Sequence, residues 1–429
     1  MRFLILSQYF PPEIGGPQTR LAAMARELVR LGHDVEVVTA LPNYPTGRVF
    51  PAFRRTFYRH ERWEEISVHR VWLYAAIGRG LKRMWNYLSF ALSSFFGLLR
   101  SRRPDYIFVE SPPLILSVPA FVMSRFWRVP FIFNVSDLWP ESAVEMEIVT
   151  SKFLIAAARL LESWTYRKAG YVNAVTNGIR ESLRVKGVPK SKLLFLPNGV
   201  DVELFKPAPP DNAFKQSLGL EGKKIVFYQG SLGYAQGLEV VLSAAKLLEN
   251  DSNIHFLFVG DGSRKADLEK LSENLALSNT TFMNPVALEE LPRFFSIAAC
   301  GLVSLRNLPL FRGARPSKIF PIMSSGKPVV FMGDGEAARL IRAARGGVVL
   351  SFGEPQVLAQ VLRQLVDRPD IAEELGKNGR RYVEEHMRWS GLIRDWLAEL
   401  PENQTKSRKL QVKNREVTTS THDRPRGIN

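Results

Sequence analysis

The chain has 429 residues, too many for one compact core, and 45% of them are hydrophobic, which suffices for packed domains. Its formal net charge of +16 favours an anionic surface or ligand as a partner. The single cysteine excludes a disulfide framework, and the six scattered histidines show no metal-binding spacing. We therefore predict a globular protein of two domains that uses no metal and no other cofactor.

The positive charge is concentrated in the first half of the chain and at its C-terminal end. Residues 1–200 hold 27 Lys and Arg against 15 Asp and Glu, whereas residues 201–401 hold 24 of each. Residues 402–429 hold 7 against 3 and follow neither a helical nor a strand period, so we predict a disordered basic tail there. The basic half suits nucleic acid or acidic lipid. Because no nucleic-acid recognition motif is present, we expect acidic lipid and no nucleic acid.

The first half of the chain alternates between strand and helix patterns. Amphipathic spacing predicts helices at residues 18–31 and 152–169. Apolar runs predict strands at residues 2–10, 34–40, 105–110, 130–135 and 171–175. This alternation is typical of a mostly parallel sheet with helices on both faces.

A second series of the same kind begins after a turn-rich linker at residues 196–210. Its predicted helices lie at residues 236–249 and 264–275, and its predicted strands at 225–229, 254–259, 280–283, 301–305 and 327–331. We therefore expect an α/β protein with two Rossmann-like, doubly wound domains that face a central cleft. The expected domains are residues 1–200 and 201–385, and a helix at 386–401 is expected to pack back on the first domain.

Glycine-rich turns follow the first strand of each series. Gly15 and Gly16 in the first series, and Gly230 and Gly233 in the second, let the backbone approach a ligand and present N–H groups to its oxygens. Their spacing differs from the dinucleotide fingerprint, which argues against a nicotinamide cofactor. A tight turn without a ligand is the alternative interpretation of each.

An acidic residue, Asp137, follows the predicted strand at residues 130–135 and precedes Trp139. The carboxyl end of a strand is where Rossmann-like folds place their chemistry, so Asp137 is a candidate to orient or deprotonate a hydroxyl. A helix N-cap, with Trp139 in the core, is the alternative.

Residues 315–318 read Arg-Pro-Ser-Lys ahead of a predicted helix that stops at Gly326. A first helical turn has free N–H groups and the positive end of the helix dipole, and Pro316 suits that turn because it lacks an N–H. Arg315, Ser317 and Lys318 are therefore predicted to form an anion site. A surface helix with ordinary charges is the alternative.

Residues 79–103 place aromatic and leucine side chains between two basic clusters. Such a segment suits a helix that lies in the headgroup region of an anionic bilayer, and its serines and Asn86 argue against a membrane span. A core helix with solvated basic ends is the alternative.

Together these segments resemble the family 4 glycosyltransferases of the two-domain GT-B fold. The resemblance spans roughly residues 1–400 and rests on residues 13–16, 197–201, 230–237, 260–262 and 316–330. Residues 9–13, 137–141 and 316–318 resemble the bacterial O-antigen and capsule subgroup, which includes fucosamine-type transferases. The wider family usually carries two glutamates eight positions apart, and these positions hold Gly313 and Pro321 here.

The resemblance implies a retaining, metal-independent glycosyltransferase of bacterial surface polysaccharide synthesis. It implies a UDP-sugar donor carrying an N-acetylated hexosamine or deoxyhexosamine, a polyprenyl-diphosphate-linked acceptor, and a cytoplasmic location on the inner face of the cell membrane. The expected catalytic residues are Asp137, Glu13 and Lys318. The expected donor-binding residues are Gly16, Gly230, Gly233, Arg306, Arg315, Ser317, Lys318 and Glu336.

Two other functions are compatible with the sequence. A nucleotide-sugar epimerase shares this architecture and needs no acceptor. A non-catalytic partner subunit of a polysaccharide assembly complex is suggested by the absent glutamate pair.

Overall fold

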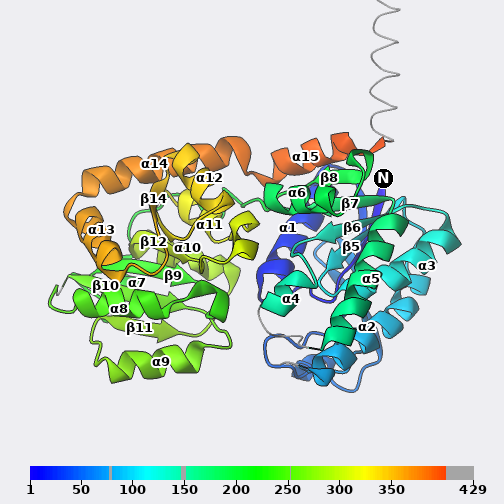
Figure 1. The fold of residues 1–429 in the computed structure, drawn as a ribbon, viewed down its shortest axis with the longest axis horizontal. Helices are drawn as coiled ribbons and strands as arrows, with labels where there is room; N and C mark the ends of the chain where they lie inside the picture. Colours follow the sequence, from blue (N-terminus) through cyan, green and yellow to red (C-terminus); the bar gives the residue numbers. More distant parts are fainter. Residues whose placement is uncertain (77–79, 146–150, 252, 402–429) are drawn as a thin grey trace, which may run out of the picture.

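The computed structural model describes residues 1–76, 80–145, 151–251 and 253–401, which form two α/β domains lying side by side (Figure 1). The first domain contains an eight-stranded sheet of order β3–β4–β2–β1–β5–β6–β7–β8. Its strands are β1 (Arg2–Leu6), β2 (Asp34–Ala40), β3 (Tyr58–Trp63), β4 (Ile66–Val71), β5 (Tyr106–Ser111), β6 (Phe131–Val135), β7 (Tyr171–Ala174) and β8 (Leu193–Phe195). All neighbours are parallel except β3 and β4.

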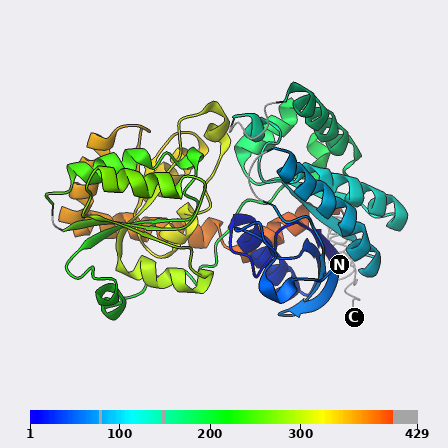
Figure 2. The ribbon, with the colours of Figure 1, turned by 90° about the horizontal axis from the view of Figure 1, so that it is seen from below.

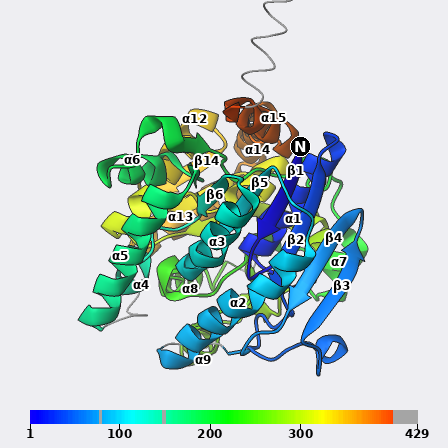
Figure 3. The same ribbon diagram turned by 90° about the vertical axis from the view of Figure 1, so that its right-hand side faces the viewer.

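Alternate residues of each central strand enter two different cores, because side chains of a strand point to opposite faces of its sheet. In β1, Leu4 and Leu6 face one core, and Phe3 and Ile5 face the other. The first core is covered by α2 (Leu81–Arg100), α3 (Ser117–Trp127), α5 (Lys152–Lys168) and α6 (Asn177–Val185). Figure 3 shows α2, α3 and α5 together on one side of this sheet. The second core is covered by α1 (Gly16–Arg30) and α15 (Trp389–Glu399).

The second domain repeats this plan around a six-stranded parallel sheet of order β11–β10–β9–β12–β13–β14. Its strands are β9 (Lys224–Gln229), β10 (Ile254–Val259), β11 (Thr280–Met283), β12 (Ala298–Ser304), β13 (Val329–Met332) and β14 (Gly347–Leu350). One face packs on α10 (Leu291–Ile297), α11 (Ile319–Ser324), α12 (Glu336–Ala344) and α14 (Pro369–His386). The other packs on α8 (Glu239–Leu247), α9 (Lys265–Asn274) and α13 (Pro355–Asp367). Two short helices, α4 (Glu141–Glu145) and α7 (Asn212–Ser217), lie in connecting segments.

The prediction of two Rossmann-like α/β domains is confirmed, and two local features differ from expectation. The antiparallel hairpin of β3 and β4 was not anticipated, because β3 carries mostly charged and aromatic side chains that are not fully buried. The helix expected from residue 236 begins at Glu239, since Gly237 adopts a left-handed conformation with φ of 56° and ends a short 3₁₀ turn first.

The end of the described chain crosses from the second domain back to the first (Figures 1 and 2). Helix α14 covers the second domain, and α15 then packs against α1 and the sheet of the first domain. The indole of Trp396 on α15 is fully buried, lies 5.9 Å from the ring of Phe3, and donates from Nε1 to Asn173 Oδ1 at 3.1 Å. Residues 402–429, for which we predicted a basic tail, lie outside the described residues.

We expect Trp396→Ala to lower the free energy of unfolding of the first domain by about 3–5 kcal/mol, because it leaves a cavity the size of an indole between α15 and the sheet. Urea denaturation followed by circular dichroism measures this loss. Trp396→Phe, which retains most of the packing and removes the N–H bond to Asn173, should cause a smaller loss of about 1–3 kcal/mol. An alanine variant as stable as the parent protein would show that α15 does not support the first domain.

Candidate active site

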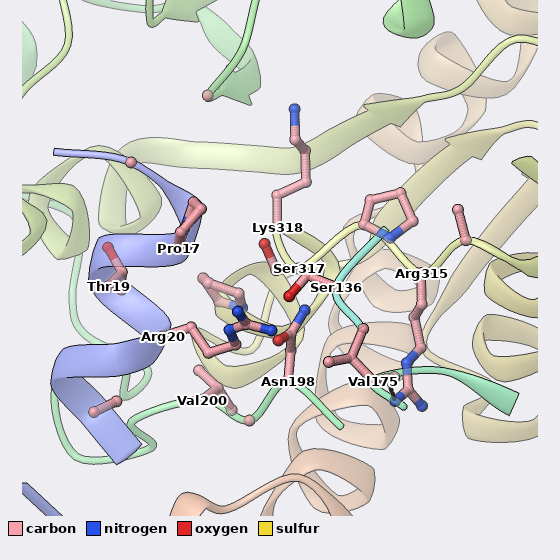
Figure 4. Close-up of a pocket in the computed structure, with 18 of the residues that line it drawn as sticks. Pro17, Thr19, Arg20, Ser136, Val175, Asn198, Val200, Arg315, Ser317 and Lys318 are labelled. Atoms are coloured by element: carbon pink, nitrogen blue, oxygen red, sulfur yellow. Dashed lines mark hydrogen bonds between the residues drawn. The ribbon is translucent and has the colours of Figure 1, made fainter. Parts of the chain in front are cut away.

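A cleft of about 2190 Å³ separates the two domains. The first domain lines it with the turns after β1, β2, β6 and β7, and the second domain with those after β9, β10 and β12. These are carboxyl ends of parallel strands, where open α/β sheets bind their ligands. Figure 4 shows part of this cleft, with Arg20 and Ser136 from the first domain and Ser317 and Lys318 from the second.

The residues expected from the sequence divide into two groups. The cleft is lined by Gly16, Asp137, Gly230, Arg315, Ser317 and Lys318. The other four, Glu13, Gly233, Arg306 and Glu336, are not among the described residues that line it. The side chains of Glu13, Arg306 and Glu336 and the N–H group of Gly233 are hydrogen-bonded to other parts of the protein. Although these residues are close in sequence to residues that line the cleft, they do not line it themselves.

Lys318 has an unusual environment for a cation. Its Nζ donates to the hydroxyl of Tyr228 at 2.7 Å and lies 4.1 Å above the centre of the same ring. Burial lowers the pKa of Lys318 to about 7. Within the described ranges, no carboxylate forms an ion pair with it. A partly buried ammonium without an acid beside it favours binding of an anion, which would raise its pKa again and restore its full charge.

Gly230 provides the space that Lys318 occupies. A Cβ built on Gly230 would lie 3.3 Å from the Lys318 Nζ, and the φ of this residue, 111°, also disfavours any side chain. Gly230 was expected to let a ligand approach. In the structure the space beside it, at the end of β9, is occupied by the ammonium group of Lys318.

The anion site differs locally from the expected helix start. Helix α11 begins at Ile319 and has six residues, so Arg315 and Pro316 precede it. The amides of Ile319 and Phe320 bond to the carbonyls of Pro316 and Ser317, which is the tighter 3₁₀ spacing. The positive charge of this segment consequently comes from Lys318 itself more than from the dipole of a long helix.

Arg315 and Glu336 hold the two domains together at one end of the cleft. The carboxylate of Glu336 accepts from the amides of Asn177 at 3.0 Å and Gly178 at 2.7 Å, in the first turn of α6. Arg315 donates to the Val175 carbonyl at 3.2 Å and lies 4.0 Å from Glu336. Glu336, which was expected to bind the donor, makes a contact between domains in this structure, because free N–H groups of a helix start attract a carboxylate.

The two backbones approach each other closely beside this contact. A Cβ on Gly178 would lie 2.3 Å from the Cα of Gly313, and the Thr176 hydroxyl donates to the Gly313 carbonyl at 2.7 Å. Gly313 occupies one of the two positions where the wider family usually has glutamate. A side chain there would collide with the first domain in this arrangement.

Glu13 lies behind the cleft wall. Its Oε1 accepts from the amides of Asn43 at 2.7 Å and Tyr44 at 2.8 Å, and the side chain is almost fully buried. Burial raises the pKa of Glu13 to about 7. In place of the expected catalytic position, the structure gives Glu13 a positioning role for the loop that carries Tyr44 into the cleft.

Arg306 and Gly233 also form their contacts within the second domain. The Arg306 guanidinium donates to the Tyr234 carbonyl at 2.8 Å, pairs with Glu239, and lies 4.4 Å from the Tyr234 ring centre. The Gly233 amide donates to Gln236 Oε1 at 3.1 Å. Both therefore organise the turn after β9, and their expected contacts with the donor stay a prediction.

Asp137 lies in the cleft directly after β6, between Ser136 and Leu138. Burial raises its pKa, and the nearby Glu141 carboxylate contributes in the same direction. A carboxyl group with a raised pKa is better suited than a solvated one to receive a proton from a hydroxyl.

The sequence did not single out Arg20, which extends from α1 into the cleft. Its side chain is 11% exposed and forms an ion pair with the buried Glu110. An arginine on an amphipathic helix is ordinarily read as a surface residue, so no local signal distinguished it. No group of three His, Cys, Asp or Glu suited to a metal ion occurs in the part of the chain that the structure describes.

The raised pKa of Glu13 predicts a pH dependence of stability. The unfolded chain releases the Glu13 proton near pH 4.5, whereas the folded protein keeps it up to about pH 7, so stability falls as the pH rises from 5 to 7. Glu13→Gln keeps an oxygen for both amides and removes the titration. Between pH 5 and pH 7 we expect the free energy of unfolding of the parent protein to fall by up to about 3 kcal/mol more than that of the variant. Urea denaturation at pH 5, 6 and 7 tests this, and parallel curves for both proteins would contradict it.

Known protein families match both domains of the chain. A family model described as a glycosyl transferase 4-like domain matches residues 15–199, and one described as glycosyl transferases group 1 matches residues 210–382. The chain is 29% identical over 339 residues to the putative colanic acid biosynthesis glycosyl transferase WcaI of Escherichia coli, covering 76% of this chain and 82% of WcaI.

Solved structures show the same two-domain fold. Sucrose-phosphate synthase from Thermosynechococcus elongatus superposes with a TM-score of 0.72 at 17% identity, covering 96% of this chain and 99% of the synthase. HepE of Anabaena, solved in complex with UDP-glucose, gives a TM-score of 0.69 at 18% identity, covering 93% and 100%. Since the two family models together span both domains, the chain belongs to the family 4-type glycosyltransferases of GT-B fold.

Proposed function

We propose that this enzyme transfers a sugar from a UDP-sugar to a lipid-linked saccharide, with retention, during the synthesis of a bacterial surface polysaccharide. The observation that carries the proposal is the partly buried ammonium of Lys318 at the cleft, with which no carboxylate forms an ion pair within the described residues. The relationship to WcaI supports polysaccharide synthesis, and the UDP-glucose complex of HepE supports a uridine diphosphate donor. The resemblance to the fucosamine-type subgroup favours an N-acetylated hexosamine or deoxyhexosamine as the sugar.

The donor diphosphate is proposed to lie between Lys318 and the first turn of α1. In the reaction, the bond between the anomeric carbon and the diphosphate oxygen breaks, and negative charge develops on the departing UDP. We propose that the Lys318 ammonium and the N–H group of Gly16, where α1 begins beside the cleft, stabilise that charge. Ser317, also in the cleft, supplies a hydroxyl to the same anion.

The acceptor is proposed to bind against the first domain, with its hydroxyl at Asp137. The carboxylate accepts a hydrogen bond from that hydroxyl, orients it toward the anomeric carbon and receives its proton as the new glycosidic bond forms. The sugar thus moves from the diphosphate oxygen to the acceptor oxygen, while the cleft walls keep water away from the anomeric carbon.

We propose that α2 contacts the membrane that holds the lipid end of the acceptor. The polar side chains of this helix face inward: Asn86 donates to the Tyr74 carbonyl at 2.8 Å, and Ser93 and Ser94 are buried. Its outward face is apolar, with side chains 39–70% exposed at Leu81, Trp85, Leu88, Leu92 and Leu99. These positions recur at helical spacing and form one stripe, which we call the α2 stripe.

The α2 stripe lies between exposed cations, which suits contact with an anionic bilayer. Lys82 is exposed at one end, and Arg100 and Arg103 at the other, whereas Arg102 is paired with Glu36. Residue 79, part of the predicted membrane segment, lies outside the described residues. Within the described ranges no helix has both the length and the apolar character to cross a bilayer, so the proposed association is peripheral.

Lys318→Met should lower kcat about 100- to 1,000-fold, since one oriented group that stabilises the departing charge is worth about 3 kcal/mol of barrier. UDP release from a donor in the presence of a lipid-linked acceptor measures the rate. Lys327→Met is the matched control: burial also lowers the pKa of Lys327, but its Nζ donates to the Ser296 carbonyl outside the cleft.

UDP binding provides a second readout for Lys318. Because burial lowers the pKa of Lys318 to about 7 in the free protein, binding of the diphosphate at pH 8 should take up a proton. Calorimetry in buffers of different ionisation enthalpy measures this uptake. Lys318→Met should abolish this uptake. Full turnover and unchanged proton uptake in the variant would remove Lys318 from the donor site.

Replacing Trp85 and Leu92 together by glutamate should weaken binding to vesicles containing phosphatidylglycerol about 10- to 100-fold, because two inserted apolar side chains are lost. Co-sedimentation measures the partition. Leu247→Glu on α8, a residue 49% exposed on the second domain, is the control and should bind as the parent does. Equal binding of all three proteins would exclude the α2 stripe as the membrane contact.

A further inference from the structure

A row of buried polar side chains crosses the sheet of the first domain beneath the cleft. Glu110 on β5, Asn134 on β6 and Asn173 on β7 are direct neighbours in the strand register, and each is 0–1% exposed. Polar groups are rarely placed in the middle of a parallel sheet, because an unsatisfied one costs about 1–3 kcal/mol. Three buried polar side chains that are neighbours in the strand register therefore indicate a specific role.

The row is fully connected by hydrogen bonds. The Asn134 amide donates to Glu110 Oε2 at 2.8 Å, and the Asn173 amide donates to Asn134 Oδ1 at 2.6 Å. The far end is closed by Trp396, whose Nε1 donates to Asn173 Oδ1 at 3.1 Å. At the near end, Ser136 donates to Glu110 Oε1 at 2.5 Å. The Glu110 carboxylate is therefore fixed from both sides.

The near end of the row holds Arg20 in the cleft. Arg20 pairs with Glu110, and within the described ranges this ion pair gives its Nη2 no aligned hydrogen bond. A guanidinium has five N–H donors, more than its pair with Glu110 can use. The side chain is 11% exposed and lines the cleft, so a ligand there would meet a largely desolvated, positioned cation.

The position of Arg20 associates it with the acceptor. The residue belongs to the first domain, and Ser136, which holds its partner Glu110, is adjacent to Asp137 in the chain and in the cleft. The proposed donor cation, Lys318, is on the opposite domain. Arg20 thus connects to the proposed acceptor hydroxyl site through Glu110 and Ser136, and a cation on that wall of the cleft suits an acidic group on the acceptor itself.

We propose that Arg20 determines acceptor specificity by binding the diphosphate that joins the acceptor sugar to its lipid, and that the Glu110–Asn134–Asn173 row positions it. This inference rests on the proposed glycosyl transfer to a lipid-linked saccharide. A bidentate guanidinium contact selects a phosphate over a neutral aglycone, which gives the enzyme a means to reject free glycosides.

The test compares two acceptors that carry the same sugar, one as a prenyl diphosphate and one as a neutral alkyl glycoside. Arg20→Gln should lower kcat/KM for the diphosphate acceptor about 10- to 100-fold and for the neutral glycoside less than about threefold. Arg20→Lys should recover part of the loss. Equal losses on both acceptors would overturn the inference, since they would assign Arg20 to the reaction itself or to the fold.

Direct binding keeps the inference testable even if no transfer is observed. Binding of a prenyl diphosphate in detergent micelles should weaken about tenfold or more in Arg20→Gln, while the affinity for UDP stays unchanged. Unchanged prenyl diphosphate binding, or weaker UDP binding instead, would contradict the assignment. Absence of any transfer by the parent enzyme, with this binding difference intact, would count against the proposed function alone.

A double variant controls for misfolding. Arg20→Gln leaves Glu110 buried without its partner, whereas Arg20→Gln with Glu110→Gln removes both charges. The double variant should show the same loss of prenyl diphosphate binding with the thermal stability of the parent. Restored binding in the double variant would show that the single variant acted through an unpaired carboxylate.

Discussion

An ammonium group buried against an aromatic ring, with no acid to neutralise it in the described structure, organises the second-domain wall of the cleft. Lys318 lies over Tyr228, and Gly230 leaves the space for it. Gly260 in turn packs so tightly on the Gly230 carbonyl that a Cβ there would lie 1.9 Å from the oxygen. The turns after β9 and β10 are thus shaped around one cation. We propose that binding of an anion compensates the remaining cost of burying this cation, which would make the site selective for negative charge.

The first domain presents a complementary wall. Arg20 and Asp137 come from two segments that the Glu110–Ser136 hydrogen bond links, and the polar row beneath them extends to Trp396 on the helix that returns from the second domain. The C-terminal crossing therefore supports both the core of the first domain and its cleft wall. The contacts of Glu336, Arg315 and Gly313 with the segment around α6 connect the domains at a second place.

Much of the fold was predictable because its signals are local. Apolar runs, helical periods and glycine turns such as Gly230 recur in order, and they specified two α/β domains. The neighbours of Lys318 in the chain also marked it as a candidate, and it does line the cleft. The roles of Glu336 and Arg306 were not, because a sequence does not show which charges are already paired inside the protein. Glu336 binds a helix start 158 residues away in the chain, at Gly178.

Two further features depend on tertiary register. The neighbours Glu110, Asn134 and Asn173 meet only once three strands align, so their row has no signature in the sequence. For α2, the sequence showed aromatic and leucine side chains with serines and Asn86 among them. It did not show that Asn86 and Ser94 face the sheet while most of the leucines face outward. The usual expectation for an amphipathic helix is the reverse.

The most direct test of the central claim is product analysis of the purified enzyme with UDP-HexNAc donors and prenyl-diphosphate-linked sugar acceptors. Mass spectrometry of the lipid and NMR of the new linkage would follow the reaction. The proposed function predicts one added sugar per lipid, UDP release that requires the acceptor, and the anomeric configuration of the donor in the product. Conversion of the donor without an acceptor, or an inverted linkage, would contradict it.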